Sequence, residues 1–169
     1  DTFHQNKKAS LDCFNIINEQ MSRALPNKAH FGFAELELLY HTNHPRIKNI
    51  RHYTQNIDDL LEKAGCKEVI HIHGKKNKIQ CLECLHQQDI DYKLTLETIC
   101  PKCGSNDIKP GAVFFNENSY EYEFMYRDFA FSTEKDIIII AGTSGNVIPI
   151  PYICNNNAIK ILVNLTQEP

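Results

Sequence analysis

The spacing of apolar residues predicts helices in the first quarter of the chain and at two later points. Apolar residues recur at helical intervals between Ser10 and Arg23, and Ser10 can act as the N-cap of that helix. The same periodicity predicts a second helix from about Lys28 to Tyr40. Short helices are expected over residues 58–64, where Gly65 would end the helix, and over residues 121–131.

Runs of β-branched and aromatic residues predict short strands between these helices. The strands are expected at residues 50–53, 69–72, 112–115, 136–141 and 159–163. The fourth run is continuously apolar, which is typical of a strand buried on both faces. Strands that alternate with helices indicate an α/β, Rossmann-like fold, in which a mostly parallel sheet carries helices on both faces and binds ligands at the carboxyl ends of its strands.

Composition excludes several classes of protein. The chain has 169 residues, of which 42% are hydrophobic and 23% are charged, so a globular domain is expected. Its net charge of −3 argues against broad binding to a nucleic-acid backbone. The longest apolar run, Ile137 to Ala141, is far shorter than the roughly 20 residues that cross a bilayer, so no membrane association is expected. Because Asp1 is not a start methionine, we expect the sequence to be cut at its ends.

Four of the seven cysteines form two CxxC pairs that are separated by 15 residues. This spacing predicts a tetrahedral zinc site, and a site closed by four protein ligands is structural; two disulfides are the alternative. The metal ligands would be Cys81, Cys84, Cys100 and Cys103, in a zinc-binding module of residues 79–104 inserted between residues 1–78 and 105–169. The other three cysteines are scattered, and the whole pattern favours a reducing, cytoplasmic location.

Polar residues follow the predicted strands. Gln55, Asn56 and Asp58 offer amide and carboxylate groups that could hold ribose hydroxyls and a carboxamide, although local turn chemistry is an equal alternative. The segment 142–144 offers a glycine turn and two hydroxyls for phosphate or ribose oxygens, or simply a capped turn. His73 directly precedes a glycine and could act as a general base near neutral pH. His71 shares its strand face by alternation, so spacing alone does not choose between the two.

Taken in order, these motifs resemble the sirtuin family of NAD-dependent protein deacylases. The matching stretches cover nearly the whole chain: Pro26 to His30, Thr54 to Asp58, Ala64-Gly65, Val69 to Gly74, the four cysteines, Lys109-Pro110, Val113 to Glu117, Gly142 to Ser144, and Asn164. The segments 142–147 and 163–165 look most like the branch that holds bacterial sirtuins and the mitochondrial desuccinylase type. The resemblance implies a Rossmann-like NAD-binding domain with an inserted module that binds one structural zinc ion.

The resemblance also implies an activity, which is the transfer of an acyl group from a lysine of a protein or peptide to NAD, with release of nicotinamide and O-acyl-ADP-ribose. It assigns His73 rather than His71 as the catalytic base, with Asn56 and Asp58 beside it. Gln55 and Asn56 match residues around the nicotinamide ribose, and Ile57 and Asp58 match those that hold the carboxamide. The remaining matches are Gly142, Thr143, Ser144 and Asn164 for the phosphates and adenosine, and Val113 and Phe115 for the acyl-lysine tunnel.

Departures from the family pattern leave alternatives open. The family's GAGxS loop and Phe-Arg pair do not occur after Asp1, and the family's final strand and helix do not follow Asn164. Asn116 replaces a glycine. A degenerate sirtuin that senses NAD or ADP-ribose, and a protein ADP-ribosyltransferase, are therefore alternatives. A zinc ribbon that binds nucleic acid is disfavoured, because residues 79–104 carry two lysines against four acidic residues.

One departure concerns the acyl group. The desuccinylase branch binds an acidic acyl group through a Tyr-x-x-Arg pair, and alignment on Phe14 puts Asn15 and Asn18 at those two positions. Without the arginine, a carboxylate loses its bidentate partner. The sequence therefore predicts a preference for acetyl or another neutral acyl group over succinyl.

Overall fold

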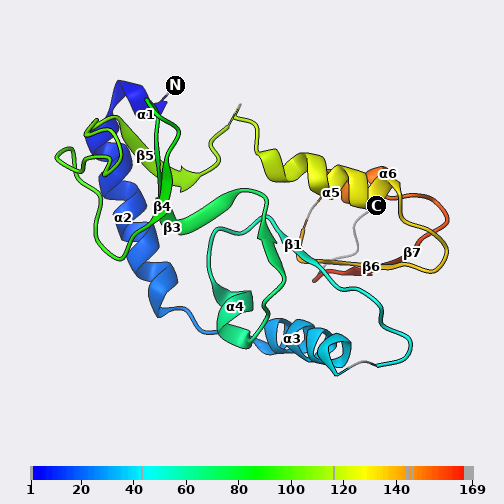
Figure 1. Cartoon of the computed structure of the whole chain (residues 1–169). Coiled ribbons are helices and arrows are strands. Elements are labelled where there is room, and N and C mark those ends of the chain that lie inside the picture. Colours follow the sequence, from blue (N-terminus) through cyan, green and yellow to red (C-terminus); the bar gives the residue numbers. More distant parts are fainter. Residues whose placement is uncertain (1, 43, 116, 144, 146, 166–169) are drawn as a thin grey trace. The chain divides into compact units, whose positions relative to one another are not determined.

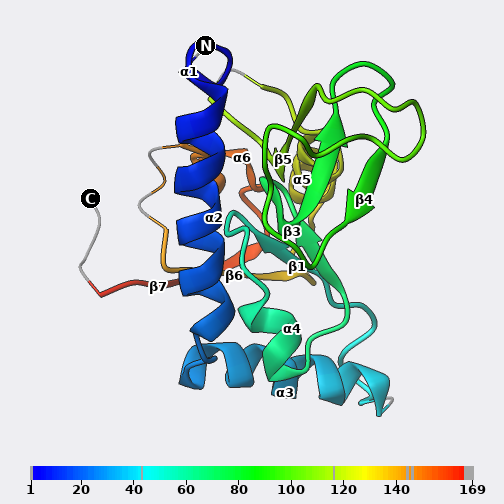
Figure 2. The same ribbon diagram turned by 90° about the vertical axis from the view of Figure 1, so that its left-hand side faces the viewer.

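The computed structural model describes residues 2–42, 44–115, 117–143, 145 and 147–165. The chain divides into two compact units, residues 1–119 and residues 120–169, and each is described by itself. Figures 1 and 2 show the elements of both units. Within the part of the chain that the structure describes, every helix is too short or too polar to cross a bilayer.

The first unit opens with a short helix, α1 (Thr2–Gln5), and the longer α2 (Lys7–Arg23). The expected N-cap at Ser10 is wrong, because the side chain of Asn6 accepts a hydrogen bond of 3.2 Å from the amide of Ala9 and so begins α2 earlier. Leu11 and Phe14 are buried, as the helical spacing predicts. Ile17, on the same predicted stripe, is exposed, so the buried part of the helix is its first half.

Capping residues fix the next two helices. α3 (Lys28–His41) begins at a capping box in which the Asn27 side chain accepts from the amide of His30 and the His30 ring bonds the amide of Asn27. α4 (Leu60–Ala64) starts two residues after Asp58, since that carboxylate accepts from the amide of Leu60 at 3.0 Å. It ends at Gly65, which adopts φ +114, as expected for a left-handed C-cap.

Two strands of the first unit form a parallel pair. β1 (His52–Thr54) and β2 (Val69–His71) lie within or beside the expected segments, and Thr54 pairs with His71 at their carboxyl ends. Gln55 and Asn56 follow β1 directly, and Ile72 and His73 follow β2, so the polar residues singled out from the sequence meet at one edge. Figure 1 shows this pair beside α4.

A three-stranded antiparallel sheet completes the first unit. Its order is β4 (Gln87–Asp89), β3 (Gly74–Cys81) and β5 (Ile108–Ala112). The strand expected at 112–115 is wrong, because pairing with β3 ends at Ala112 and the chain then turns away. α2 packs on this sheet through a core that joins both CxxC pairs to the helix (Figure 2): Phe3, Leu11, Phe14, Ile79, Cys81, Ile90, Leu94, Cys100 and Ile108.

The second unit holds a parallel pair and two helices. Its elements are α5 (Tyr120–Ala130), β6 (Ile137–Ala141), α6 (Ile150–Ile153) and β7 (Ile159–Val163), with β6 and β7 paired over their full length. The expectation that β6 is buried on both faces is wrong in the described chain. Ile140 is buried, whereas Ile137 and Ile139, which alternate with it, are 60% and 38% exposed, so among the described residues nothing covers their face of the strand.

The expected α/β class is confirmed, since both β1–β2 and β6–β7 are parallel pairs accompanied by helices. The antiparallel sheet is the part of the architecture that the apolar pattern does not predict.

Candidate functional site

The loop after β1 is held by its own side chains and by the neighbouring sheet. The hydroxyl of Thr54 accepts from the amide of Asn56 at 3.1 Å, and the carbonyl of Ile57 accepts from the amide of Lys76 at 2.8 Å. Ile57 also packs against the apolar core. Gln55 and Asp58 are half-buried, whereas Asn56 is exposed. The loop is therefore a rigid segment that presents an amide side chain to solvent.

The two histidines at the carboxyl end of β2, His71 in the strand and His73 just after it, both bond carbonyls of this loop. Nδ1 of His73 donates to the carbonyl of Gln55 at 2.7 Å, and Nδ1 of His71 donates to the carbonyl of Asn56 at 3.0 Å. A carbonyl only accepts, so Nδ1 carries a proton in both rings. In a neutral His73 ring the basic nitrogen is therefore Nε2, which is the arrangement that a general base requires.

His71 has a second partner that removes it from such a role. Its Nε2 lies 2.8 Å from Oε1 of Glu62, and the same oxygen accepts from Lys75 at 3.0 Å. Both nitrogens of His71 thus face acceptors, and the side chain is almost fully buried. Burial alone would raise the pKa of Glu62, but the hydrogen bonds from His71 and Lys75 outweigh it and hold that pKa below its usual value. The spacing of the sequence does not separate the two histidines, and the contact with Glu62 shows how the ring of His71 is held.

A close approach of two backbones fixes the segment after His73. Gly74 has φ +78 and pairs with Ala112, and a Cβ at position 74 would lie 1.9 Å from the carbonyl oxygen of Gly111. The amide of Val113 donates to the carbonyl of His73 at 2.9 Å. The histidine that precedes the glycine is therefore joined to the segment that begins at Val113, which the resemblance assigns to the acyl-lysine tunnel.

A buried lysine organises this segment. Nζ of Lys109, which is almost fully buried, donates to the carbonyl of Ala112 at 3.0 Å and to Glu117, and it lies 4.6 Å from the centre of the Phe114 ring. Glu117 also accepts from the amide of Phe114 at 2.8 Å. Phe115, the second residue assigned to the tunnel, is 94% exposed. The sequence assigns no role to Lys109 and Glu117, because these residues are eight positions apart and no periodic pattern signals a turn of this kind.

The predicted NAD residues of the second unit also meet one another. Ala141 pairs with Val163 at the carboxyl ends of β6 and β7, and the amide of Gly142 donates to the carbonyl of Val163 at 3.0 Å. Asn164 then donates through its side-chain amide to the carbonyl of Thr143 at 2.8 Å. Ser144, which belongs to the same prediction, and Asn116 lie outside the described residues.

The four cysteines of the CxxC pairs converge. Their sulfur atoms all lie within 4.8 Å of one another, with Cys81 to Cys103 at 3.6 Å and Cys84 to Cys100 at 3.7 Å. Tetrahedral zinc with Zn–S bonds of about 2.3 Å separates its ligands by about 3.8 Å. None of the four is in a disulfide. The donor set and its spacing therefore fit a structural zinc ion.

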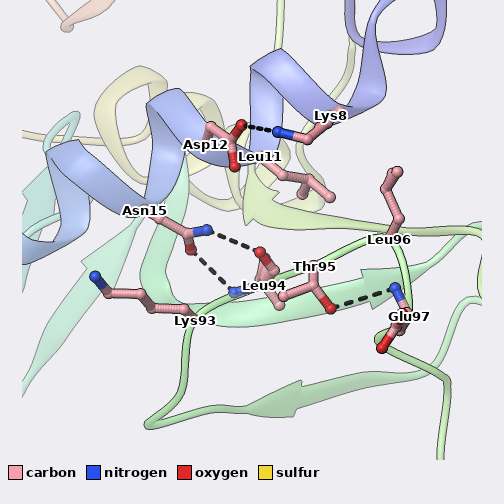
Figure 3. Close-up of a pocket in the computed structure, with 9 residues that line it drawn as sticks. All are labelled: Lys8, Leu11, Asp12, Asn15, Lys93, Leu94, Thr95, Leu96 and Glu97. Carbon is pink, nitrogen blue, oxygen red and sulfur yellow. Dashed lines mark hydrogen bonds and ion pairs between the residues drawn. The ribbon is translucent and has the colours of Figure 1, made fainter.

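A shallow groove of about 450 Å³ lies between α2 and the chain segment that precedes the second CxxC pair. In Figure 3 the Asn15 side chain spans it, donating to the carbonyl of Leu94 at 2.8 Å and accepting from the Leu94 amide at 2.9 Å. Asn15 is the one residue on its wall that was singled out from the sequence. The groove is lined by Lys8, Leu11, Asp12, Asn15, Lys93, Leu94, Thr95, Leu96 and Glu97.

Comparison with known proteins gives a family match and several similar proteins. Residues 1–149 match the model of the Sir2 family. The chain is 38% identical over 151 residues to an NAD-dependent protein deacylase of Helicobacter hepaticus, with 83% of this chain and 58% of that protein covered. It is 36% identical over 148 residues to the protein of the same name from Campylobacter jejuni, with 88% and 60% covered. The chain thus spans about three fifths of the length of the curated relatives it matches.

Solved structures show the same similarity. A Sir2 homologue in complex with NAD superposes with a TM-score of 0.82 at 32% identity, covering 99% of this chain and 64% of the other. Sir2Tm bound to a propionylated peptide superposes with a TM-score of 0.76 at 28% identity, covering 100% and 71%.

Proposed function

Because the chain belongs to the Sir2 family, we propose that this protein is an NAD-dependent protein lysine deacylase. The observation that carries the proposal is the 2.7 Å contact between Nδ1 of His73 and the carbonyl oxygen of Gln55. Because a carbonyl only accepts, Nδ1 donates, and in a neutral ring Nε2 is the basic nitrogen. The named activities of the relatives from Helicobacter hepaticus and Campylobacter jejuni support it.

Residues of each unit would bind a different part of NAD. The loop 54–58 offers an exposed amide at Asn56 on a backbone fixed by the rings of His71 and His73. We propose that Gln55 and Asn56 hold the nicotinamide ribose and that Ile57 and Asp58 hold the carboxamide. In the second unit, Gly142, Thr143, Ser144 and Asn164 would bind the phosphates and adenosine.

When bound, NAD supplies an electrophilic ribose carbon and nicotinamide as the leaving group. The part of this chain is to place the acyl-lysine and to move a proton. Val113 and Phe115 would line the acyl-lysine, which enters as an extended strand. His73 would take a proton from a ribose hydroxyl at Nε2, while its bond to Gln55 keeps the ring in position. Asn56 and Asp58 complete the catalytic group.

Zinc and the domain arrangement belong to the same proposal. Cys81, Cys84, Cys100 and Cys103 would hold one structural zinc ion in a module of residues 79–104, inserted in the NAD-binding domain that residues 1–78 and 105–169 contribute to. No role in binding nucleic acid is proposed. A reducing, cytoplasmic location is proposed from the cysteine pattern, and all seven cysteines are free thiols.

We propose that the preferred acyl group is neutral, acetyl rather than succinyl. Of the two asparagines at the positions of the Tyr-x-x-Arg pair, Asn15 is used to hold the backbone of Leu94 and carries no charge for an acyl carboxylate. Comparable rates of desuccinylation and deacetylation by the full-length protein would contradict this preference.

The test is turnover by the full-length protein with NAD and an acetyl-lysine peptide. Loss of the acetyl mass from the peptide and formation of O-acetyl-ADP-ribose are expected, both dependent on NAD. His73→Ala should abolish both, whereas His86→Ala, which changes a histidine in the turn between β3 and β4, should leave them unchanged.

Other outcomes separate the alternatives. Binding of NAD or ADP-ribose without any turnover would favour a degenerate sirtuin that acts as a sensor. A gain of ADP-ribose mass on a protein substrate, with the acetyl group retained, would indicate an ADP-ribosyltransferase.

A further inference from the structure

A second set of metal-binding side chains lies in the first unit, on other elements than the CxxC pairs. Glu37 from α3, His52 from β1 and Cys66 from the turn after α4 bring a carboxylate oxygen, an imidazole nitrogen and a sulfur within 4.8 Å of one another. All three residues are buried, and Glu37 is only 2% exposed. Burying an ionised carboxylate costs free energy unless hydrogen bonds or positive charges stabilise it, so the burial of Glu37 requires an explanation.

The carboxylate of Glu37 is held in one orientation by the backbone. The amide of Lys67 donates to both oxygens, at 2.9 and 3.0 Å, and the amide of Glu68 donates to Oε1 at 3.1 Å. Metal-ligating carboxylates are commonly fixed by such surrounding donors. The opposite side of the carboxylate faces imidazoles, since Oε2 lies 3.1 Å from Nε2 of His52.

A further histidine lies beside the carboxylate of Glu37. His41 is one helical turn after Glu37 on α3, and its Nε2 lies 3.2 Å from Oε1 of Glu37. The side chain of His41 is 40% exposed, so it stands at the solvent side of an otherwise buried group. Residues at i and i+4 share a helix face and can bind one ion together.

We propose that Glu37, His52 and Cys66 bind a zinc ion that is distinct from the one held by the four cysteines, and that the ring of His41 turns from Glu37 to the ion as its fourth ligand. Nitrogen, sulfur and carboxylate oxygen together are the donors that zinc takes in proteins, whereas calcium and magnesium prefer oxygen alone. Binding releases the thiol proton of Cys66 to solvent, and both imidazoles bind in their neutral form. Four protein ligands leave no open position, so the ion is structural.

Such an ion would join three separate segments. α3, β1 and the turn that connects α4 to β2 each supply a ligand, and β1 leads directly into the loop 54–58. The ion would thereby fix the base of that loop. This inference depends only on the cluster and stands whether or not the chain is a deacylase.

The decisive measurement is the number of zinc ions per chain. The full-length protein is equilibrated with zinc chloride, freed of excess metal on a desalting column, and analysed by inductively coupled plasma mass spectrometry. Two ions per chain are expected. Cys66→Ser and His52→Gln should each reduce the count to one, and Cys84→Ser should also leave one, held by the Glu37 cluster.

Cys154→Ser is the matched control, since Cys154 is a buried free cysteine of the second unit, and it should keep two ions. Cobalt substitution gives an independent readout, because in Cys84→Ser the remaining cobalt should show the spectrum of a single-thiolate site. A wild-type protein with one zinc ion, or a second ion that survives both Cys66→Ser and His52→Gln, would overturn the proposal. The wild-type count decides the matter even where a variant fails to fold.

Discussion

The carbonyl oxygen of His73 accepts a hydrogen bond of 2.9 Å from the amide of Val113. The residue proposed as the base and the first residue proposed to line the acyl-lysine are therefore neighbours through their backbones, 40 positions apart in the sequence. The contact exists because Gly74 lets β3 approach β5 with no side chain between them. A change at either strand should consequently alter both the position of the base and the entry of the peptide.

Gly74→Ala tests this approach directly. The added methyl group would meet the Gly111 carbonyl oxygen at 1.9 Å, in a backbone conformation that L residues disfavour. We expect a loss of about 3 kcal/mol or more in the free energy of unfolding, measured by urea denaturation. Gly104→Ala shares the positive φ but meets nothing within 4 Å, so it should cost only about 1 kcal/mol. Equal losses in the two variants would show that the contact with Gly111 is unimportant.

Glu117→Gln tests the positioning of the peptide segment. The substitution leaves the buried Lys109 ammonium without its carboxylate partner and weakens the turn that carries Phe114 and Phe115. We expect KM for an acetyl-lysine peptide to rise about tenfold while kcat changes less, since the base is not touched. Glu97→Gln, at an exposed acid, should change neither constant. An unchanged KM in Glu117→Gln would mean that the segment is ordered without this ion pair.

Asn15→Ala tests the link between α2 and the zinc-binding module. It removes both hydrogen bonds to the Leu94 backbone, and Leu94 itself is buried, so about 1–3 kcal/mol of stability should be lost. Asn18→Ala, one turn further along the same helix, is the matched control and should be nearly neutral. Acyl preference should not change in either variant. Thermal unfolding of the two variants side by side gives the comparison.

Glu62→Gln tests the contribution of the Glu62 carboxylate to stability. Because the folded-state pKa of Glu62 is lowered, its ionised form contributes stability above the unfolded value of about 4.5, and that contribution is lost as the pH falls through the folded pKa. The variant should be about 1 kcal/mol less stable than wild type at pH 7, and the difference should shrink below about pH 4. Glu83→Gln, at an exposed acid, should match wild type at both pH values. A difference that is independent of pH would point to packing rather than charge.

Cys84→Ser tests the zinc site of the CxxC pairs. Cys81 and Cys100 belong to the same core as Leu11 and Phe14, so loss of the ion should loosen the packing of α2 on the antiparallel sheet. We expect a loss of several kcal/mol in stability and rapid proteolysis within residues 79–104. Cys13→Ser, at an exposed cysteine, should behave as wild type.

The sequence predicts those elements whose signals are local. The apolar spacing predicts α3 from Lys28 to Tyr40, one residue short of its observed end at His41. Its start is encoded locally, since Asn27 and His30 form the cap within the same segment. β3 was missed because its residues are mostly polar, and its buried Lys76 is compensated by Asp59, at 2.9 Å, in a distant part of the chain. A lysine in such a polar segment is expected to be exposed until that partner is known.

The candidate site divides in the same way. The motifs identify His73 and the loop that begins at Gln55. From the sequence, only the resemblance to a family favours His73 over His71, and in the structure the contact of His71 with Glu62 adds a second reason. The role of Lys109 depends on a turn that brings it to Glu117, and no pattern of apolar spacing encodes that turn.

The hydrogen bond from the Leu94 amide to the Asn15 side chain makes this amide a probe of the contact between α2 and the segment around Leu94. The Leu94 amide belongs to no strand, yet its proton is bonded to a side chain of α2. Its exchange for deuterium is expected when helix and segment separate, and where reclosing is fast the exchange rate reports the population of that separated state rather than the fraying of a sheet. Slow exchange at this one position would mean that the helix and the segment stay together in solution.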